Sequence, residues 1–216
     1  MKPLVYSLLG LLLTGCSNGV VVSVPENYHV SNSSEQGYLV GSLGASTIWP
    51  STGENLQSTL YFRRQGSDTD LAVSNNNNDS DFKTSHLTSS LFTVPLPAGN
   101  YELHSITFKG TDGRKTVFSQ TEKPLNVHFS ISAGEITYLG QFIASSMVSK
   151  SQLWNTEYPN GRGYLTHSDA EQRDRAFLYQ QHPELSALFF KKAALEKSPS
   201  PLLKVENQAT QSINTL

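Results

Sequence analysis

The chain has 216 residues, which suits one compact domain or one domain with an appendage. Charged residues make up 16% of it and the formal net charge is -2, so no strong field favours nucleic acid as a partner. The single cysteine excludes an intrachain disulfide and a zinc site built from several cysteines.

The start of the chain has the pattern of an export signal. One lysine precedes an apolar run at residues 4–13, which is shorter than the roughly 20 residues that a membrane-spanning helix needs. The run ends in a tetrapeptide that resembles the bacterial lipobox at all four positions, Leu13-Thr14-Gly15-Cys16. The resemblance implies that residues 1–15 are a lipoprotein signal peptide. It also implies that Cys16 becomes the first mature residue and carries a diacylglycerol on its sulfur.

Lipid on Cys16 predicts attachment to a membrane without a spanning helix. Each buried methylene contributes about 0.8 kcal/mol, and two or more acyl chains make the attachment stable. In Gram-negative lipoproteins, a serine such as Ser17 after the cysteine favours sorting to the outer membrane, facing the periplasm. We therefore predict a lipid-anchored cell-envelope protein. Residues 16–36 are predicted to be a polar tether with one edge strand around Val20.

Strand patterns fill residues 37–146. Phe92, Val94 and Leu96 fall on one face of one run, and apolar residues alternate with polar ones from Leu125 to Ile131. About seven such runs recur at roughly the 8–12-residue spacing of a sandwich. The predicted fold is mainly β, an antiparallel β-sandwich of about seven strands with two short C-terminal helices.

Turn signals separate these runs. Residues 97–100 and the Ala133-Gly134 pair are predicted to turn strands back into hairpins, and Asp112-Gly113 is the strongest short hairpin signal. A short apolar run at residues 71–73 is predicted to be a strand. Around it, residues 66–90 include a polar block that cannot bury apolar area, which predicts a mobile surface loop.

Two of these segments resemble a known group of β-sandwiches. One matches the pattern LPAG-x-Y-x-L at Leu96-Pro97-Ala98-Gly99, Tyr101 and Leu103. The other matches F-x-V-x-x-G-x-x-x-Y-L-G, with Ile131 at the valine position, from Phe129 to Gly140. Both patterns are similar to hairpins of transthyretin-like and carboxypeptidase-regulatory-like domains, which uncharacterised bacterial lipoproteins carry behind a lipobox. The resemblance implies a fold and an envelope location but no activity.

The pattern changes after the sheet. Residues 147–197 are predicted to be a junction followed by helices, and Ser168 to Glu171 fits a capping box. Apolar residues then recur at helical spacing, and Pro183 interrupts them, so it is predicted to start a second short helix. Residues 198–216 are predicted to be a flexible tail.

No cofactor motif occurs in the sequence, and no nucleophile elbow or metalloprotease motif does. The sequence therefore predicts a non-enzymatic module that binds an envelope protein or a glycan. Exposed aromatic residues near loops are typical of such binding, and the candidates are Trp49, Trp154, Tyr158 and Tyr164. The alternatives are a hydrolase with a site at one end of the sandwich, or a metal-binding periplasmic protein.

The metal hypothesis depends on His104 and His128, which lie on predicted strands and could be neighbours. Two solvent-facing histidines on polar strand faces explain the same pattern without a metal. The sequence therefore favours no bound metal and no cofactor.

Overall fold

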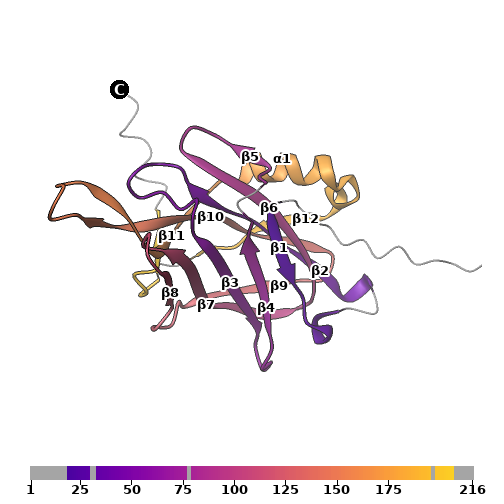
Figure 1. The fold of residues 1–216 in the computed structure, drawn as a ribbon. Helices are drawn as coiled ribbons and strands as arrows, with labels where there is room; N and C mark the ends of the chain where they lie inside the picture. The colour runs from indigo at the N-terminus through magenta and orange to yellow at the C-terminus, as the bar shows by residue number, and fades with distance from the viewer. Residues whose placement is uncertain (1–18, 30–32, 77–78, 196–197, 207–216) are drawn as a thin grey trace, which may run out of the picture.

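Two β-sheets packed face to face form the molecule (Figure 1). The computed structural model describes residues 19–29, 33–76, 79–195 and 198–206. The predicted signal peptide at 1–15 and the predicted lipid site Cys16 therefore lie outside the described residues. The mainly-β sandwich is confirmed. The described residues form thirteen strands rather than about seven, because several short edge strands lie in segments predicted to be loops.

The first sheet has six strands, all antiparallel to their neighbours. Its order is β1-β4-β3-β7-β8, and β9 pairs with the other end of β7. The bounds are β1 Val20–Ser23, β3 Gln57–Arg64, β4 Asp70–Asn75, β7 Gly99–Thr111, β8 Thr116–Gln120 and β9 Val127–Ile131.

The second sheet has seven strands in the order β13-β11-β10-β2-β6-β5, with β12 also paired to β10. It is mixed, since β2 and β12 run parallel to β10 and β13 runs parallel to β11. The bounds are β2 Gln36–Ser46, β5 Phe82–Lys83, β6 Leu87–Pro97, β10 Glu135–Lys150, β11 Glu157–Ser168, β12 Phe189–Lys192 and β13 Leu203–Val205.

The main core fills the space between the sheets. Phe92, Val94 and Leu96 are buried there on one face of β6, as the alternation predicts. Aromatic rings interlock across the core, where Phe62 meets Phe129 edge to face with centroids 6.0 Å apart. The neighbouring Leu91 points the other way and is also buried, because a helix covers the outer face of the second sheet.

That helix is α1, Glu171–Gln181, and the 3-10 turn η3, Pro183–Ala187, follows it. Leu178 and Leu185 pack on the sheet, as predicted, although the second helix is only a 3-10 turn. The predicted capping box is wrong. Ser168 still belongs to β11, and the carboxylate of Asp169 accepts the N–H of Glu171 at 3.0 Å instead. Two further 3-10 turns are η1, Glu26–Tyr28, and η2, Ser33–Glu35.

A buried ion pair fixes α1 to the sheet. Asp174 is fully buried, and the Arg173 guanidinium contacts its Oδ1 at 2.6 Å. The hydroxyls of Ser42 and Tyr138 each donate to the other oxygen, Oδ2, at 2.8 Å. Burial, followed by the charge of Asp174, raises the pKa of Tyr138 above its ordinary value, so this hydroxyl remains a donor. The network gives both oxygens of the buried carboxylate hydrogen-bond donors.

Two of the predicted hairpins are instead corners between the sheets. β6 and β7 lie in different sheets, and so do β9 and β10. Both corners bond to the start of β2: Ala98 donates its N–H to Glu35 O at 3.1 Å, and Gly134 donates to Gln36 O at 2.8 Å. The prediction failed because a sheet-crossing corner and a hairpin turn use the same Gly-containing chemistry. The hairpin at Asp112-Gly113, which joins β7 to β8, is confirmed.

The edge strand predicted around Val20 within the tether is β1, which lies at the edge of the first sheet and pairs with β4 along its whole length. Two predicted boundaries are wrong. The predicted loop at 66–90 contains β5 and the start of β6, whereas β4 includes the short strand predicted at residues 71–73. The predicted junction and tail hold β11 and β13. β11 is mostly polar, and β13 has only three residues, so neither gives an extended apolar alternation. None of the described helices is long and apolar enough to cross a membrane.

Candidate binding groove

The β10–β11 hairpin extends beyond the sandwich as an arm, seen in brown and orange at the left of Figure 1. We define the arm as residues 147–161. It begins at a register shift between Ser146 and Val148. At its tip Ser151 donates its N–H to Thr156 O at 2.8 Å, and Asn155 takes a positive φ of 50°. The arm is therefore an ordered hairpin that leaves the sheet by a bulge.

Two glycines allow the base of the arm to pack closely against β7. A Cβ at Gly161 would lie 2.7 Å from the carbonyl carbon of Thr111, and its φ is +80°. A Cβ at Gly163 would lie 2.2 Å from the ring of Phe108. Only glycine permits these approaches, so the arm and the β7–β8 turn are held at a fixed separation.

The β7–β8 turn presents two cations toward the arm. The Asp112 carboxylate accepts the backbone N–H groups of Arg114 and Lys115, both at 2.9 Å. These bonds, from Lys115 first and then Arg114, hold the pKa of Asp112 below its ordinary value. The acid is therefore occupied by its own turn, whereas the side chains of Arg114 and Lys115 remain available.

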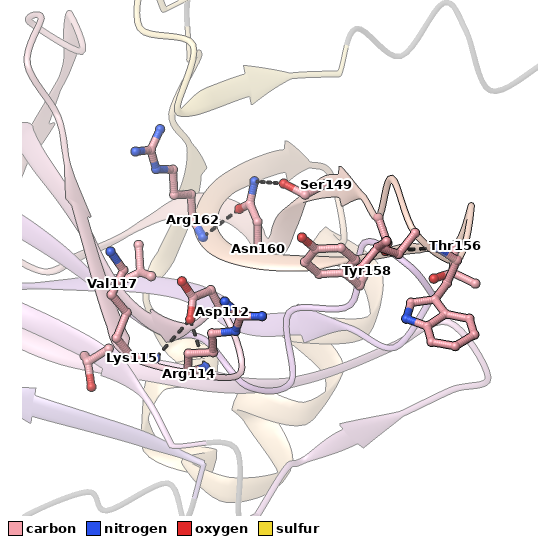
Figure 2. Close-up of a pocket in the computed structure, with 13 residues that line it drawn as sticks. Asp112, Arg114, Lys115, Val117, Ser149, Thr156, Tyr158, Asn160 and Arg162 are labelled. Atoms are coloured by element: carbon pink, nitrogen blue, oxygen red, sulfur yellow. Dashed lines mark hydrogen bonds between the residues drawn. The ribbon is translucent and has the colours of Figure 1, made fainter.

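The arm and this turn form the two walls of a groove of about 960 Å³ (Figure 2). On the arm side, Asn160 donates to Ser149 Oγ at 3.1 Å and accepts the N–H of Arg162 at 3.0 Å. The groove is lined by Asp112, Arg114, Lys115, Thr116, Val117, Ser149, Ser151, Leu153, Trp154, Thr156, Tyr158, Asn160 and Arg162.

The charge of this groove is mostly positive. Arg114, Lys115 and Arg162 line it, and none of them forms an ion pair with a described residue. Asp112 is the one carboxylate among the lining residues. Cationic side chains without a partner carboxylate are available for an anionic ligand.

The structure brings together two of the four predicted aromatic residues. Trp154 is 79% exposed at the tip of the arm and Tyr158 is 37% exposed on β11, and both line the groove. Trp49 is exposed in the loop after β2 and does not line the groove. Tyr164 lies farther along β11, where Lys204 Nζ is 3.7 Å from the centre of its ring.

The three cations of the groove were not predicted from the sequence. Arg114 and Lys115 directly follow the Asp112-Gly113 turn, so a hairpin turn with two adjacent basic residues is the signal that was available. Arg162 falls in a Gly-Arg-Gly segment that is too short for a phosphate loop. No sequence pattern places it beside a turn some fifty positions earlier.

His104 and His128 lie near one hollow of the first sheet but do not converge on a point. His104 Nε2 is 2.9 Å from Asp70 Oδ1, too poorly aligned for a hydrogen bond, and Asp70 also accepts from Arg63. His128 is 3.8 Å from the carboxylate of Glu102. Within the described ranges, no group of three or more histidine, cysteine or acidic side chains could hold a metal ion.

A histidine–carboxylate pair lies outside the groove, after α1. His182 Nδ1 lies 3.2 Å from Glu184 Oε1, at an exposed position after α1. In the part of the chain that the structure describes, no hydrogen bond joins a histidine ring to a serine hydroxyl. The fold and the groove thus define a β-sandwich with a groove lined by cationic and aromatic side chains. Comparison with family models, curated proteins and solved structures finds no match to this chain.

Proposed function

We propose that this protein is a lipid-anchored module of the bacterial cell envelope that binds a protein or glycan partner and performs no catalysis. The observation that carries the proposal is the groove, where Trp154 and Tyr158 stand beside three unpaired cations on an ordered arm. A large exposed aromatic surface is costly in water, and it is typical of a surface that a partner covers.

The anchor in this proposal is lipid on Cys16. Its support is the lipobox, together with the early start of the folded sheet at Val20. Val20 lies four positions after Cys16, and an extended chain over four positions reaches about 14 Å. A sandwich tied in this way would stand next to the bilayer, so its partner would be found close to the membrane surface.

The anchor is tested with the full-length protein and its Cys16→Ala variant in a bacterial host. Intact mass should show a chain that begins at Cys16 and carries acyl groups, and the protein should fractionate with membranes. Cys16→Ala should remain uncleaved or lose the attachment. A mature chain with a free thiol and no acyl mass would contradict the proposed anchor.

The role of the groove is tested by cross-linking in the same cells. A photoreactive phenylalanine replaces Trp154, and in a matched control it replaces Phe189, which is 67% exposed on β12. Position 154 should give a discrete cross-linked product that position 189 does not give. Identical products from both positions, or none from position 154, would contradict a partner in the groove.

A further inference from the structure

We infer that the ligand of this groove is an acidic oligosaccharide, with carboxylate or phosphate groups on its sugar rings. The inference rests on the proposed function and names the chemical class of the partner. Its first support is aromatic. The rings of Trp154 and Tyr158 combine an apolar face with a polar edge, and such a face packs against the C–H face of a sugar ring.

The second support is the order of polar groups along the arm. Tyr158, Asn160 and Arg162 all line the groove from β11, with the bulge at Gly161 between the last two. Ser149 pairs with Tyr158 across the hairpin and accepts from Asn160 at 3.1 Å. This row offers hydroxyl, amide and guanidinium groups next to an aromatic ring, which suits the alternating polar and apolar surface of a sugar.

The third support is charge. The groove collects Arg114 and Lys115 from one wall and Arg162 from the other, and no described carboxylate pairs with them. Asp112 supplies one negative charge against the three cations, so a neutral sugar would leave the groove with an excess of positive charge. An acidic sugar supplies the counter-charge through charge-assisted bonds, and a guanidinium binds a carboxylate or a phosphate with two donors.

Single-stranded nucleic acid also combines phosphates with stacking bases. The chain as a whole argues against it, because its net charge is -2 and only three cations line the groove. Nucleic-acid binding depends on many phosphate contacts. A volume of about 960 Å³ accommodates a short oligosaccharide, since pockets of roughly 300–1,000 Å³ hold ligands of that size.

The two tryptophans of this chain make a direct experiment available. In the full-length protein in detergent, Trp49→Phe leaves Trp154 as the fluorescent reporter of the groove. Trp154→Phe leaves Trp49, which is 66% exposed elsewhere, as the matched control. Each variant is titrated with tetragalacturonate and with phosphorylated pentamannose, which separate carboxylate from phosphate. Maltotetraose and unphosphorylated mannopentaose are the neutral counterparts.

We expect a saturable change in Trp154 fluorescence with at least one acidic probe, and no change with its neutral counterpart or in the Trp49 reporter. Arg162→Ala should weaken the affinity about tenfold, which is the scale of one charge-assisted bond. Lys83→Ala removes an exposed cation on β5, outside the groove, and should leave the affinity unchanged. Added salt should weaken the binding.

Several results would overturn the inference. These are no response of a folded Trp154 reporter to either acidic probe, an equal response to neutral sugars, or tighter binding of poly(dT) or anionic vesicles. If the sugars fail while position 154 still cross-links a discrete partner in cells, the acidic glycan is wrong and the binding module stands. If cross-linking and lipid attachment also fail, the proposed function itself is wrong.

Discussion

The two halves of strand β10 have opposite surroundings. Every residue from Ile136 to Ser146 is buried, because the facing sheet covers one side and α1 with η3 covers much of the other. From Met147 to Lys150 the same strand alternates between half-buried and exposed positions, because neither cover reaches the arm. One continuous strand thus passes from a doubly covered core into a hairpin open to solvent.

The difference separates stability from binding. In the covered half each side chain is held by packing, so a change there costs folding free energy. In the arm the backbone pairing and a few glycines fix the shape, so the side chains are available to contact a partner. The following predictions test this division, beginning with the largest expected effect.

Phe142→Ala should destabilise the protein by about 3–5 kcal/mol, because the ring is fully buried between the sheets and its loss leaves a cavity. Val148, on the same strand but 41% exposed, is the control, and Val148→Ala should cost less than about 1 kcal/mol. Urea unfolding followed by circular dichroism measures both. Equal costs would show that the arm is packed as tightly as the core.

Asp174→Ala should cost about 3 kcal/mol, because it leaves Arg173, Ser42 and Tyr138 without their shared acceptor. We expect the lower end of the range for buried pairs, since the Arg173 side chain is 32% exposed and can regain water. The same unfolding measurement applies.

The control for Asp174 lies on the same helix. Glu171→Ala removes a more exposed pair with Arg175, whose atoms are 3.6 Å apart, and should cost less than about 0.5 kcal/mol. A similar cost for both substitutions would mean that the buried network does not hold α1 on the sheet.

Gly161→Ala should cost about 1–3 kcal/mol and move the arm, because alanine is strained at a φ of +80° and its Cβ would meet Thr111 at 2.7 Å. Gly113→Ala has the same strain at +88° but has open space around its Cβ. The Trp154 reporter distinguishes them. The emission of Trp154 and its response to ligand should change in Gly161→Ala and remain unchanged in Gly113→Ala. The reverse result would show that the packing of Gly161 on Thr111 does not position the arm.

His167 should make the covered sheet sensitive to acid. Burial lowers its pKa, although its ring contacts Leu139 O at 2.7 Å, a bond that favours the protonated form. As the pH falls, the unfolded chain therefore takes up a proton on His167 before the folded chain does. The contribution of His167 to the free energy of unfolding is complete above about pH 6.5 and declines as the pH falls below that value. The slope should be at most about 1.4 kcal/mol per pH unit.

Urea unfolding at about pH 5.5 and about pH 8 measures this slope, because the first value lies below the ordinary histidine pKa and the second lies above it. His167→Gln can still donate to Leu139 but does not titrate, so its slope should be shallower by the His167 contribution. The other five histidines remain in the variant and report the background. An unchanged slope in His167→Gln would show that His167 titrates equally in both states.

The strands of the covered region could largely be predicted from the sequence. Period-2 alternation identifies the buried faces of β6 and β9, since each of these strands packs one row of side chains into the core. Alternation within one strand does not identify the strand with which it pairs. The passages from β6 to β7 and from β9 to β10 therefore read as hairpins, although each crosses between sheets.

The groove could be predicted only in part, and for a related reason. The arm has no buried face, so it has no apolar period to detect, and only its aromatic residues stand out. Trp154 and Tyr158 were found in this way. The three cations come from two segments far apart in sequence, and the packing of β11 on β7, at Gly161 and Gly163, brings those segments together.

The smallest effect on stability should come from the tip of the arm. Trp154→Ala removes a side chain that is 79% exposed, so the free energy of unfolding should change by less than about 0.5 kcal/mol. The same substitution should reduce ligand binding strongly, because it removes the largest aromatic face of the groove. Urea unfolding and titration with the acidic probes measure the two quantities on one preparation. A loss of stability above about 1 kcal/mol would mean that Trp154 is held by the fold, and the arm would then belong with the covered half of β10.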